Sequence, residues 1–304
     1  MSSSVRASVR AALRRTLYPT LEGVWGAWFA LAGRLSRAPG RTEPWSPAGG
    51  APVLIVATHP DDEVSGCGGV VCLHRDAGDP VAILVVTDGR ASRAFGGSPP
   101  VVAARRAAEA HAAGKTLEVA RLELAGLHEG AWRLEEGVKT IRRILQAWRP
   151  AVVYAPSRID YHPEHLRVAR ACAAALAGLG GRRPVVRAYE TFVPLGPGLV
   201  NLVANISAVE ERKTAAIACY TSQRRGLAQV RRRDRYVARF YGAGQAAEAF
   251  RELSSDAYVA LVEAGRFHDD RSPFRGLRGR PLTDPLAYVV GGAVRRRLRH
   301  LPPT

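Results

Sequence analysis

The sequence predicts an α/β fold, in which a mostly parallel sheet has helices on both of its faces. The first observation is a continuous apolar run, Val53–Val56, which is typical of a strand buried on both faces. The second is the alternation of such runs with longer helical stretches, which favours a parallel sheet. The third is that polar tips follow these runs, at the strand ends where α/β proteins bind ligands. The fold is therefore expected to be Rossmann-like.

The expected elements follow one another regularly from residue 52 to residue 220. We expect strands over residues 52–57, 81–86, 119–124, 151–155, 185–193 and 202–206. We expect helices over residues 63–76, 101–117, 135–148, 166–179 and 210–220. Pro150 stops one of these helices and Gly180-Gly181 closes another. After about Ala246 the chain is expected to be helical.

The length of 304 residues suits one large domain with extensions. We expect a single catalytic domain over residues 49–255, between a basic leader (1–48) and a basic C-terminal extension (256–304). The apolar stretch at 23–33 predicts an amphipathic helix that packs on the protein or lies on a membrane, with a weak signal peptide as the alternative. The arginine-rich end, 293–301, predicts a solvated tail or an electrostatic membrane tether.

The charge of the chain constrains its partners. A net charge of +17 and a pI of about 10.7 favour an anionic partner, either a phosphate- or carboxylate-bearing substrate or a membrane surface. Nucleic acid is not expected, because the arginines are spread along the chain without a recognised motif. No apolar run reaches the length of a membrane span, and the four cysteines have no metal-binding spacing and are expected to be reduced. We expect a cytoplasmic protein, with peripheral attachment to the inner face of the membrane as the alternative.

An acidic loop follows the first predicted strand. It contains His59, Asp61, Asp62 and Glu63. Three carboxylates beside one imidazole repel one another unless a cation lies among them, and a divalent metal is the simplest candidate. The alternative is structural, because an Asp-Asp pair at this position could cap the following helix.

A second polar cluster, Asp160 to His165, follows the fourth predicted strand. If the two loops share one crevice, His59, Asp62 and His165 form a two-histidine, one-carboxylate site with open positions, which suits catalytic zinc. Asp61 is then free to accept a proton from a water molecule. His162 is available to stabilise a tetrahedral intermediate or to protonate a leaving amine.

The chain resembles the PIG-L / LmbE-like family of zinc-dependent N-deacetylases, which act on N-acetylglucosamine-type amines, and the resemblance covers about residues 52 to 252. The matching residues are Thr58–Glu63 with the glycine-cysteine cluster after it, Thr87–Gly89, Arg106 and Glu109, His162–His165, Tyr189–Glu190, Ser207, Lys213 and Ser222–Gln223.

The resemblance implies a role for each site residue. His59, Asp62 and His165 correspond to the metal ligands, Asp61 to the general base and His162 to its electrostatic or acidic partner. The substrate-binding residues implied are Arg106, Glu129 and Asp160. Two positions depart from the family pattern, because Glu164 and Glu129 both stand where aspartate is usual. Glu164 leaves the pKa of His162 open, and the longer side chain of Glu129 is expected to shift substrate preference.

The function implied is removal of the N-acetyl group from an N-acetylglucosamine-type conjugate, with Zn²⁺ as the cofactor and Fe²⁺ as the alternative. One rival is a deacylase of another amide-bearing glycolipid, thiol-sugar conjugate or antibiotic scaffold. The other is a non-catalytic, membrane-peripheral binding protein, against which the complete metal and base set argues. The sequence leaves open whether the protein forms a homo-oligomer.

Overall fold

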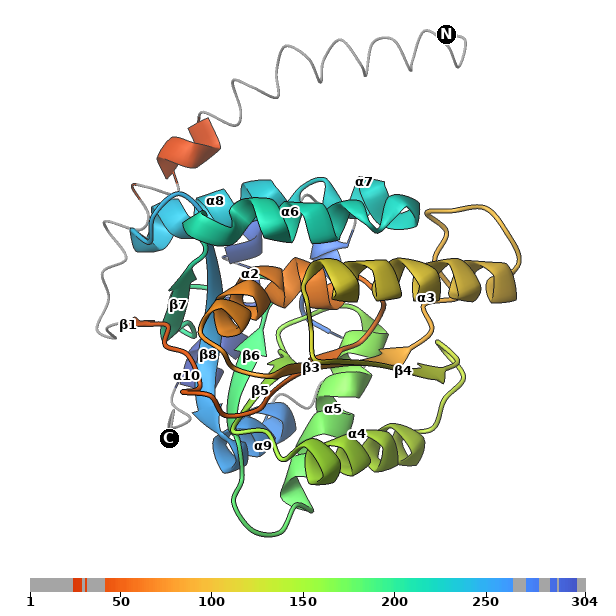
Figure 1. The fold of residues 1–304 in the computed structure, drawn as a ribbon. Helices are drawn as coiled ribbons and strands as arrows, with labels where there is room; N and C mark the ends of the chain where they lie inside the picture. Colours follow the sequence, from red (N-terminus) through yellow and green to blue (C-terminus); the bar gives the residue numbers. More distant parts are fainter. Residues whose placement is uncertain are drawn as a thin grey trace, which may run out of the picture.

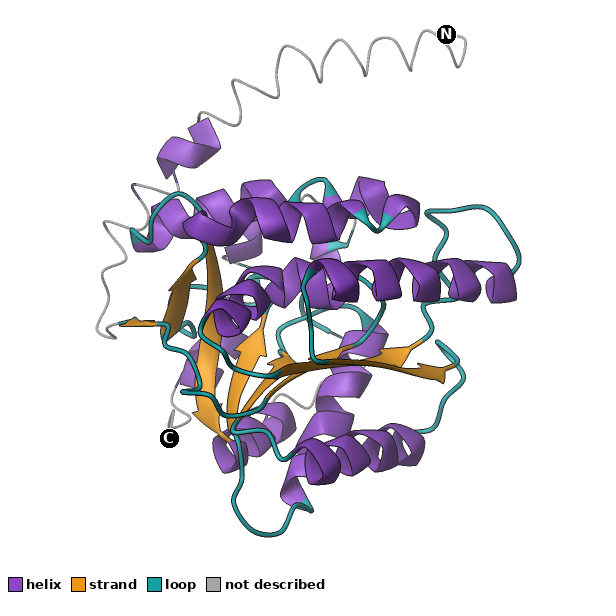
Figure 2. Ribbon diagram, in the orientation of Figure 1, coloured by secondary structure: helices purple, strands orange, loops and turns teal. Residues whose placement is uncertain are grey.

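The computed structural model describes residues 24–28, 31, 42–264, 272–278, 285–288 and 290–299. Within these residues an eight-stranded sheet has the order β1-β7-β8-β6-β5-β2-β3-β4 (Figures 1 and 2). Every pair of neighbouring strands is parallel except for the two pairs that β8 makes. The predicted α/β class with a mostly parallel sheet is confirmed.

The strands are β1 (Glu43–Pro44), β2 (Val53–Ala57), β3 (Val81–Thr87), β4 (Arg121–Leu127), β5 (Val152–Pro156), β6 (Val185–Tyr189), β7 (Leu202–Asn205) and β8 (Ala247–Ser254). The helices are α2 (Asp62–Asp76), α3 (Pro99–Thr116), α4 (Leu134–Trp148), α5 (Pro163–Ala177), α6 (Glu210–Ala218), α7 (Arg224–Leu227), α8 (Val230–Tyr241), α9 (Ser255–Ala264) and α10 (Gly292–Arg299). Most predicted elements lie within a few residues of these bounds.

Helices cover both faces of the sheet. Helices α2, α3 and α6 lie on one face, and α4, α5 and α9 lie on the other (Figure 1). Each face has its own apolar cluster, to which the central strands contribute alternate residues: Val53 and Ile55 face one cluster, whereas Leu54 and Val56 face the other. This burial on both faces explains why the central strands are continuously apolar in the sequence.

The strand order places a crevice between β2 and β5. The chain runs from β2 outwards through β3 and β4, then returns to β5 on the other side of β2 and continues outwards to β6. Ligands of doubly wound sheets bind at such a reversal, beyond the carboxyl ends of the strands. The two polar loops of the sequence follow β2 and β5, so the fold brings them to this crevice.

The glycine cluster in α2 permits close packing. A Cβ atom on Gly66 would lie 2.4 Å from the Tyr189 ring, and one on Gly69 would lie 2.5 Å from Ile206. Such contacts are too short for any residue but glycine, so the cluster lets α2 approach strand β6 and the segment after β7 closely. This packing fixes the helix that begins at Asp62.

The prediction of helix directly after Ala246 was wrong for residues 247–254, which form β8. Ala, Glu, Arg and Leu dominate this stretch and favour helices in isolation. Here the strand fills the space between β6 and β7 and pairs antiparallel with both. Tertiary pairing therefore overrides local propensity, and the expected helix begins only at α9.

The two extensions contribute to the folded body where they are described. Residues 43–44, from the predicted leader, pair with β7. Part of the predicted leader helix is present, since residues 24–28 and 31 are helical, and the rest of the 23–33 stretch lies outside the described residues. The Trp25 side chain packs against Tyr236 and Phe240 of α8. In the part of the chain that the structure describes, no helix is both long and apolar enough to cross a bilayer.

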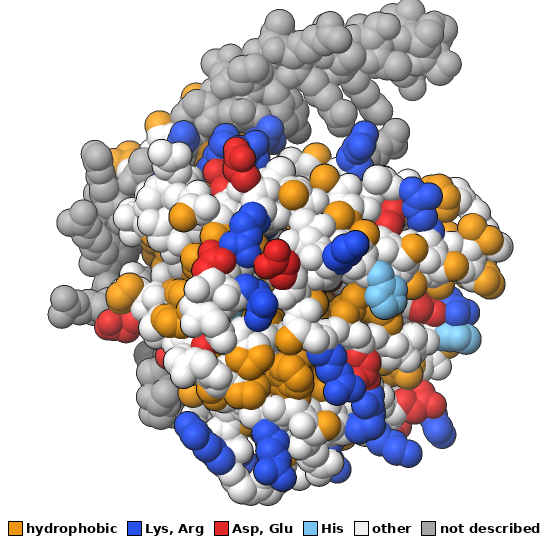
Figure 3. Space-filling view, viewed as in Figure 1, with side chains coloured by type: hydrophobic (Ala, Val, Ile, Leu, Met, Phe, Trp, Pro, Cys, Tyr) orange, Lys and Arg blue, Asp and Glu red, His pale blue; other side chains and the backbone are white. Residues whose placement is uncertain are grey.

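The arginine-rich C-terminal end forms α10, and one of its four arginines departs from both predictions for this segment. Arg295 is buried and donates hydrogen bonds to the backbone carbonyls of Leu195 (3.1 Å), Pro194 (2.6 Å) and Ala287 (2.8 Å). It is therefore neither solvated nor available to a membrane, whereas Arg296, Arg297 and Arg299 are exposed. Over the face drawn in Figure 3, cationic side chains are scattered among acidic and apolar ones.

Candidate metal centre and catalytic pocket

The three predicted metal ligands converge at the crevice. The Nδ1 atom of His59 lies 3.3 Å from the Oδ2 atom of Asp62 and 3.3 Å from the Nε2 atom of His165. The third side of this triangle, from His165 Nε2 to Asp62 Oδ2, is 3.4 Å. His59 lies in the loop after β2, Asp62 is the first residue of α2, and His165 comes from the first turn of α5.

The shape of this triangle fits a tetrahedral metal ion. Ligand atoms that each lie about 2.05 Å from a tetrahedral zinc ion are separated by about 3.3 Å. All three side chains are at least nine-tenths buried. Burying two imidazole nitrogens and a carboxylate oxygen this close together costs free energy unless a cation lies between them. The two-histidine, one-carboxylate donor set also suits ferrous iron, so the donors alone do not choose between the two metals.

His162 is the fourth donor close to this centre. Ring nitrogens of His59, His162 and His165 all lie within 4.8 Å of one another. The His162 ring is half-buried and meets the His59 ring edge-on, with ring centroids 5.0 Å apart. Its Nδ1 atom is buried and has no hydrogen-bond partner among the described residues. His162 therefore borders the triangle rather than completing it.

Asp160 lies behind His165. Its Oδ2 atom is 3.0 Å from His165 Nδ1, and its Oδ1 atom accepts hydrogen bonds from the backbone amides of Tyr161 and His162, at 2.6 and 2.8 Å. Asp160 is 2% exposed and does not line the pocket. This placement favours orientation of the histidine ligand, a common arrangement in zinc sites, over the direct substrate contact that the sequence predicts.

Asp61 stands beside the triangle in an unusual backbone conformation, with φ of 128° and ψ of −19°. Its Oδ1 atom accepts a hydrogen bond from Arg106 Nη2 at 2.8 Å. Although Asp61 occupies the N-cap position of α2, its side chain makes no capping hydrogen bond. The capping alternative therefore does not account for this carboxylate, which is free to act in the pocket.

Arg106 is 4% exposed and donates hydrogen bonds to three oxygens at and around Asp61. Besides Asp61, its Nη2 atom donates to the Pro60 carbonyl at 2.6 Å and its Nη1 atom donates to the Gly89 carbonyl at 3.1 Å. Gly89 has a positive φ of 64°, and a Cβ atom there would lie 2.4 Å from the guanidinium. The Thr-Asp-Gly strand end thus makes room for Arg106.

Glu129 and Glu164, the two positions that depart from the family pattern, are placed differently. Glu129 Oε1 lies 3.2 Å from His59 Nε2, which is within ion-pair distance. The two groups are not aligned for a hydrogen bond, so His59 Nε2 has no hydrogen-bond partner among the described residues. Its Oε2 atom accepts the Ala91 backbone amide at 3.0 Å. Glu164 instead accepts the Trp132 indole N–H at 2.5 Å and is not seen to bond His162.

The side chains form a pocket of about 210 Å³. His59, Asp61, Asp62, Arg106, Glu129 and His162 line its polar side. Phe192, Leu227 and Val230 provide an apolar wall, and Phe192 also stacks on the His165 ring at 5.0 Å and 11°. No signal in the sequence singled out these three residues, because each is an ordinary apolar residue in a loop or at one end of a helix.

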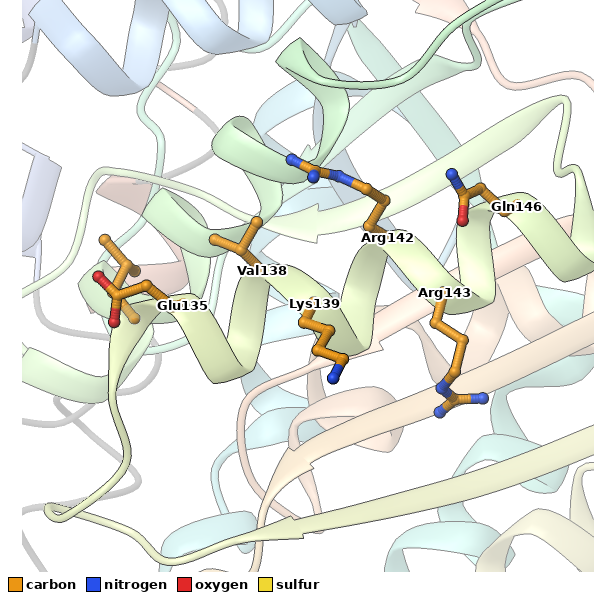
Figure 4. A pocket seen from close by; sticks show the side chains of 7 residues that line it. Glu135, Val138, Lys139, Arg142, Arg143 and Gln146 are labelled. Atoms are coloured by element: carbon orange, nitrogen blue, oxygen red, sulfur yellow. The ribbon is translucent and has the colours of Figure 1, made fainter.

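A larger hollow of about 510 Å³ runs along α4 (Figure 4). Its lining includes Glu135, Lys139, Arg142 and Arg143, together with Leu134 and Val138. It contains a single carboxylate and no histidine or cysteine, so it lacks the donors of a metal site. The catalytic chemistry is therefore assigned to the smaller pocket.

Burial and close charges shift the pKa values of the pocket residues. Burial raises the pKa of Asp61 to about 6, although the Arg106 guanidinium opposes this. Burial lowers the pKa of His162 to about 3, with help from the neighbouring His165 and His59. Burial opposes ionisation of Asp62, but His165 and His59 hold its pKa well below the usual value. The ionised aspartate is the form that binds a metal ion.

A profile of the family "PIG-L: GlcNAc-PI de-N-acetylase" matches residues 54–176, which include every residue of the predicted site. The probable N-acetyl-alpha-D-glucosaminyl L-malate deacetylase 2 of Bacillus cereus is 30% identical over 189 residues, which are 56% of this chain and 83% of that protein. The chain belongs to the PIG-L family. The resemblance deduced from the sequence motifs is thus confirmed.

Solved structures support the fold of this PIG-L protein. The N,N'-diacetylchitobiose deacetylase of Pyrococcus horikoshii has a TM-score of 0.60 at 22% identity, over 68% of this chain and 85% of that one. A conserved protein of Thermus thermophilus has a TM-score of 0.55 at 28% identity, over 66% and 93%. The 4-carboxy-2-hydroxymuconate hydratase of Pseudomonas putida has a TM-score of 0.55 at 21% identity, over 67% and 96%. This last enzyme shows that the fold hosts more than one reaction, so the site must decide the chemistry.

Proposed function

We propose that this PIG-L protein is a metal-dependent N-deacetylase that hydrolyses the acetamide of an N-acetylglucosamine-type conjugate to acetate and a free amine. The observation that carries the proposal is the triangle of His59, Asp62 and His165 with a second carboxylate, Asp61, beside it, only one oxygen of which is bound by Arg106. Family membership supports the same reaction. Deacetylases similar to this chain are named for N-acetylglucosaminyl malate, for diacetylchitobiose and for the biosynthesis of teicoplanin.

A divalent ion held by His59, Asp62 and His165 would supply Lewis acidity, which makes a bound water more acidic and polarises the amide carbonyl. Asp61 is proposed to accept the proton of the attacking water as its oxygen adds to the carbonyl carbon. Arg106 holds the Asp61 carboxylate by one of its oxygens, so the other oxygen is left for this proton.

His162 is proposed to stabilise the oxyanion and to assist departure of the amine. Its ring borders the pocket and is at hand for the oxyanion that forms when water adds. When the C–N bond breaks, the nitrogen takes a proton and leaves as the amine, while the acyl carbon leaves as acetate. The proton that Asp61 takes from the water balances this step, and the His162 ring is proposed to relay it to the nitrogen.

We propose Zn²⁺ as the metal, because the three nearly equal ligand separations match tetrahedral coordination, with Fe²⁺ as the alternative. Arg106 and Glu129 are proposed to contact the substrate, since both line the pocket. Asp160 is proposed to orient His165 rather than to bind substrate. Elemental analysis of the purified protein distinguishes the two metals.

Replacement of Asp61 by Ala tests the proposed reaction. The variant should lose turnover in a free-amine release assay with N-acetylglucosamine conjugates, yet it should bind its metal with the wild-type stoichiometry. Activity that survives in Asp61→Ala would remove Asp61 from the role of base. Failure of the wild-type protein to release amine from any amino-sugar amide would contradict the function itself.

A second substrate class has support from the apolar wall of the pocket. Phe192, Leu227 and Val230 would favour an amide whose acyl group or neighbouring substituent is apolar, as in a lipid-linked sugar or an acylated natural product. Parallel assays with N-acetyl and longer N-acyl glucosamine conjugates separate the two classes. A higher kcat/KM for the longer acyl chain would favour the second class.

Peripheral contact with an anionic membrane is proposed as a separate property of the leader. Val24, Trp28 and Leu31 lie at i, i+4 and i+7 spacing and are 60%, 38% and 55% exposed. The protein as a whole is cationic, which favours an anionic surface. Co-sedimentation with anionic vesicles should fall in the variant Trp28→Ser/Leu31→Ser. Val101→Ser on α3 is the matched control, because it removes an exposed apolar side chain outside the leader, and this variant should bind the vesicles normally.

A further inference from the structure

The backbone of Asp61 is strained in a way that calls for support from neighbouring residues. Its φ of 128° lies outside the left-handed helical region that Glu118 and Arg149 occupy, with φ of 54° and 49°. Among the described residues these are the three non-glycine residues with positive φ. A side-chain-bearing residue keeps such a conformation only where the surrounding structure holds it, and such residues cluster at functional sites.

A buried carboxylate holds the backbone amide of Asp61. The Asp61 N–H donates to Glu63 Oε2 at 3.0 Å, so the Glu63 side chain bends back over the start of α2. The other oxygen of this carboxylate accepts a short hydrogen bond from the Tyr220 hydroxyl. Glu63 and Tyr220 are 2% and 1% exposed, so neither bond competes with bulk water.

The hydroxyl of Tyr220 matters because it fixes the rotation of the Glu63 carboxylate. Without it, one oxygen of Glu63 would be buried and unpaired, and the side chain could turn away from the Asp61 amide. The peptide between Pro60 and Asp61 could then rotate towards an ordinary conformation. That rotation would carry the Asp61 side chain away from the metal triangle and from Arg106.

We propose that Glu63 and Tyr220 are positioning residues that hold Asp61 in the strained conformation required of a general base. Neither residue touches the pocket, and both act through the Asp61 backbone. The inference rests on the proposed role of Asp61 in deacetylation. The proposal gives a role to the contact between the start of α2 and the segment that follows α6, which are far apart in the sequence.

Tyr220→Phe removes the hydroxyl and keeps the ring. It should lower kcat roughly 5- to 10-fold, the effect of one lost hydrogen bond, with KM and metal content unchanged. Glu63→Gln keeps an acceptor for the Asp61 amide and should retain most of the activity, whereas Glu63→Ala should not. Tyr258→Phe is the matched control, because Tyr258 is also fully buried and donates a single hydrogen bond, to the Pro156 carbonyl at 2.8 Å. It should leave kcat unchanged.

Amide hydrogen exchange in the metal-free protein provides a readout that does not depend on turnover. In Tyr220→Phe the Asp61 amide should exchange roughly tenfold faster, while the Asp62 amide, which donates to the His59 carbonyl at 3.2 Å, should not change. In an Asp61→Asn background, Tyr220→Phe should add no further loss of kcat.

Two results would overturn the proposal. One is wild-type exchange of the Asp61 amide in Tyr220→Phe. The other is a lower melting temperature with normal kcat per folded molecule, which would make Tyr220 a purely structural residue. If the wild-type enzyme deacetylates nothing, the proposed function fails, but the exchange experiment still decides whether the two residues hold Asp61.

Discussion

The Oδ2 atom of Asp160 lies 3.0 Å from the Nδ1 atom of His165, on the side of the ring opposite the metal triangle. This contact assigns the proton of the imidazole to Nδ1 and leaves Nε2 to face His59 and Asp62. Two backbone amides fix the other oxygen of Asp160, so the carboxylate cannot easily rotate. The orientation of the ligand is therefore built into the loop after β5.

Asp160→Ala should weaken metal binding by roughly 10- to 100-fold, as is usual when the partner of a histidine ligand is lost. Chelator competition measures this affinity directly. Asp256→Ala is a suitable control, because Asp256 is an exposed aspartate whose partner is Arg183 on the surface. Unchanged metal affinity in Asp160→Ala, with raised KM, would instead support the substrate contact that the sequence predicts.

Arg106→Ala should lower kcat by roughly 100-fold, because Asp61 and the Pro60 carbonyl lose the group that fixes them together. Arg106→Lys should recover only part of this loss, since an ammonium group cannot reproduce the guanidinium fork. Arg105→Ala is the neighbouring control, and its side chain is 47% exposed. Steady-state kinetics at equal metal content measures kcat for both variants. Equal kcat values for Arg106→Ala and Arg105→Ala would contradict the prediction.

Much of this site could be predicted from the sequence because its residues follow apolar strands directly. His59, Asp62 and His165 follow β2 and β5, and parallel strands that are neighbours place their carboxyl ends side by side. Residue type and position after an apolar strand were enough to group these three. The backbone amide contacts of Asp160 could not be predicted, because they depend on the local path of the loop.

The elements that the sequence did not reveal depend on distant partners. Strand β8 has a helix-favouring sequence and forms only because β6 and β7 both pair with it. Arg295 lies in a run of arginines, and its burial depends on carbonyls about 100 residues earlier in the chain. Tyr220 meets Glu63 across 157 residues. Local pattern contains no information on such contacts, which the tertiary fold creates.

Lys213→Met should destabilise the protein by about 3–5 kcal/mol, because it leaves buried carboxylates without their cation. The Lys213 ammonium bonds Asp234 and lies 2.7 Å from Glu248 Oε1. Glu248 in turn accepts the Gly69 and Val70 amides in the middle of α2, at 2.8 and 2.9 Å.

The adjacent Arg212 provides a matched control for this substitution. Its partner is Asp76, and the two side chains are 38% and 50% exposed. Arg212→Met should cost less than about 1 kcal/mol, as is typical of surface ion pairs. Urea unfolding of both variants measures the difference. Equal effects would mean that the buried charges contribute no more than a surface pair.

A buried hydrogen-bond chain makes the stability depend on pH. The Tyr154 hydroxyl accepts hydrogen bonds from Trp45 Nε1 and Arg187 Nη1, at 2.8 and 2.9 Å, so its own proton is left for His74 Nε2 at 3.1 Å. His74 must then be neutral, with its Nδ1 proton donated to Asp79 at 2.6 Å. Burial accordingly lowers the pKa of His74 to about 4.

Because the pKa of His74 is lower in the folded protein than the unfolded value of about 6.5, protons bind the unfolded chain more tightly. The contribution of His74 should be unaffected by pH above about 6.5 and should become destabilising as the pH falls towards 4, by about 3 kcal/mol in all. Urea unfolding of the metal-free protein at several pH values, compared with His74→Gln, isolates this contribution. The wild-type curve should fall more steeply than that of the variant between pH 6.5 and 4, and parallel curves would show that His74 is not held neutral.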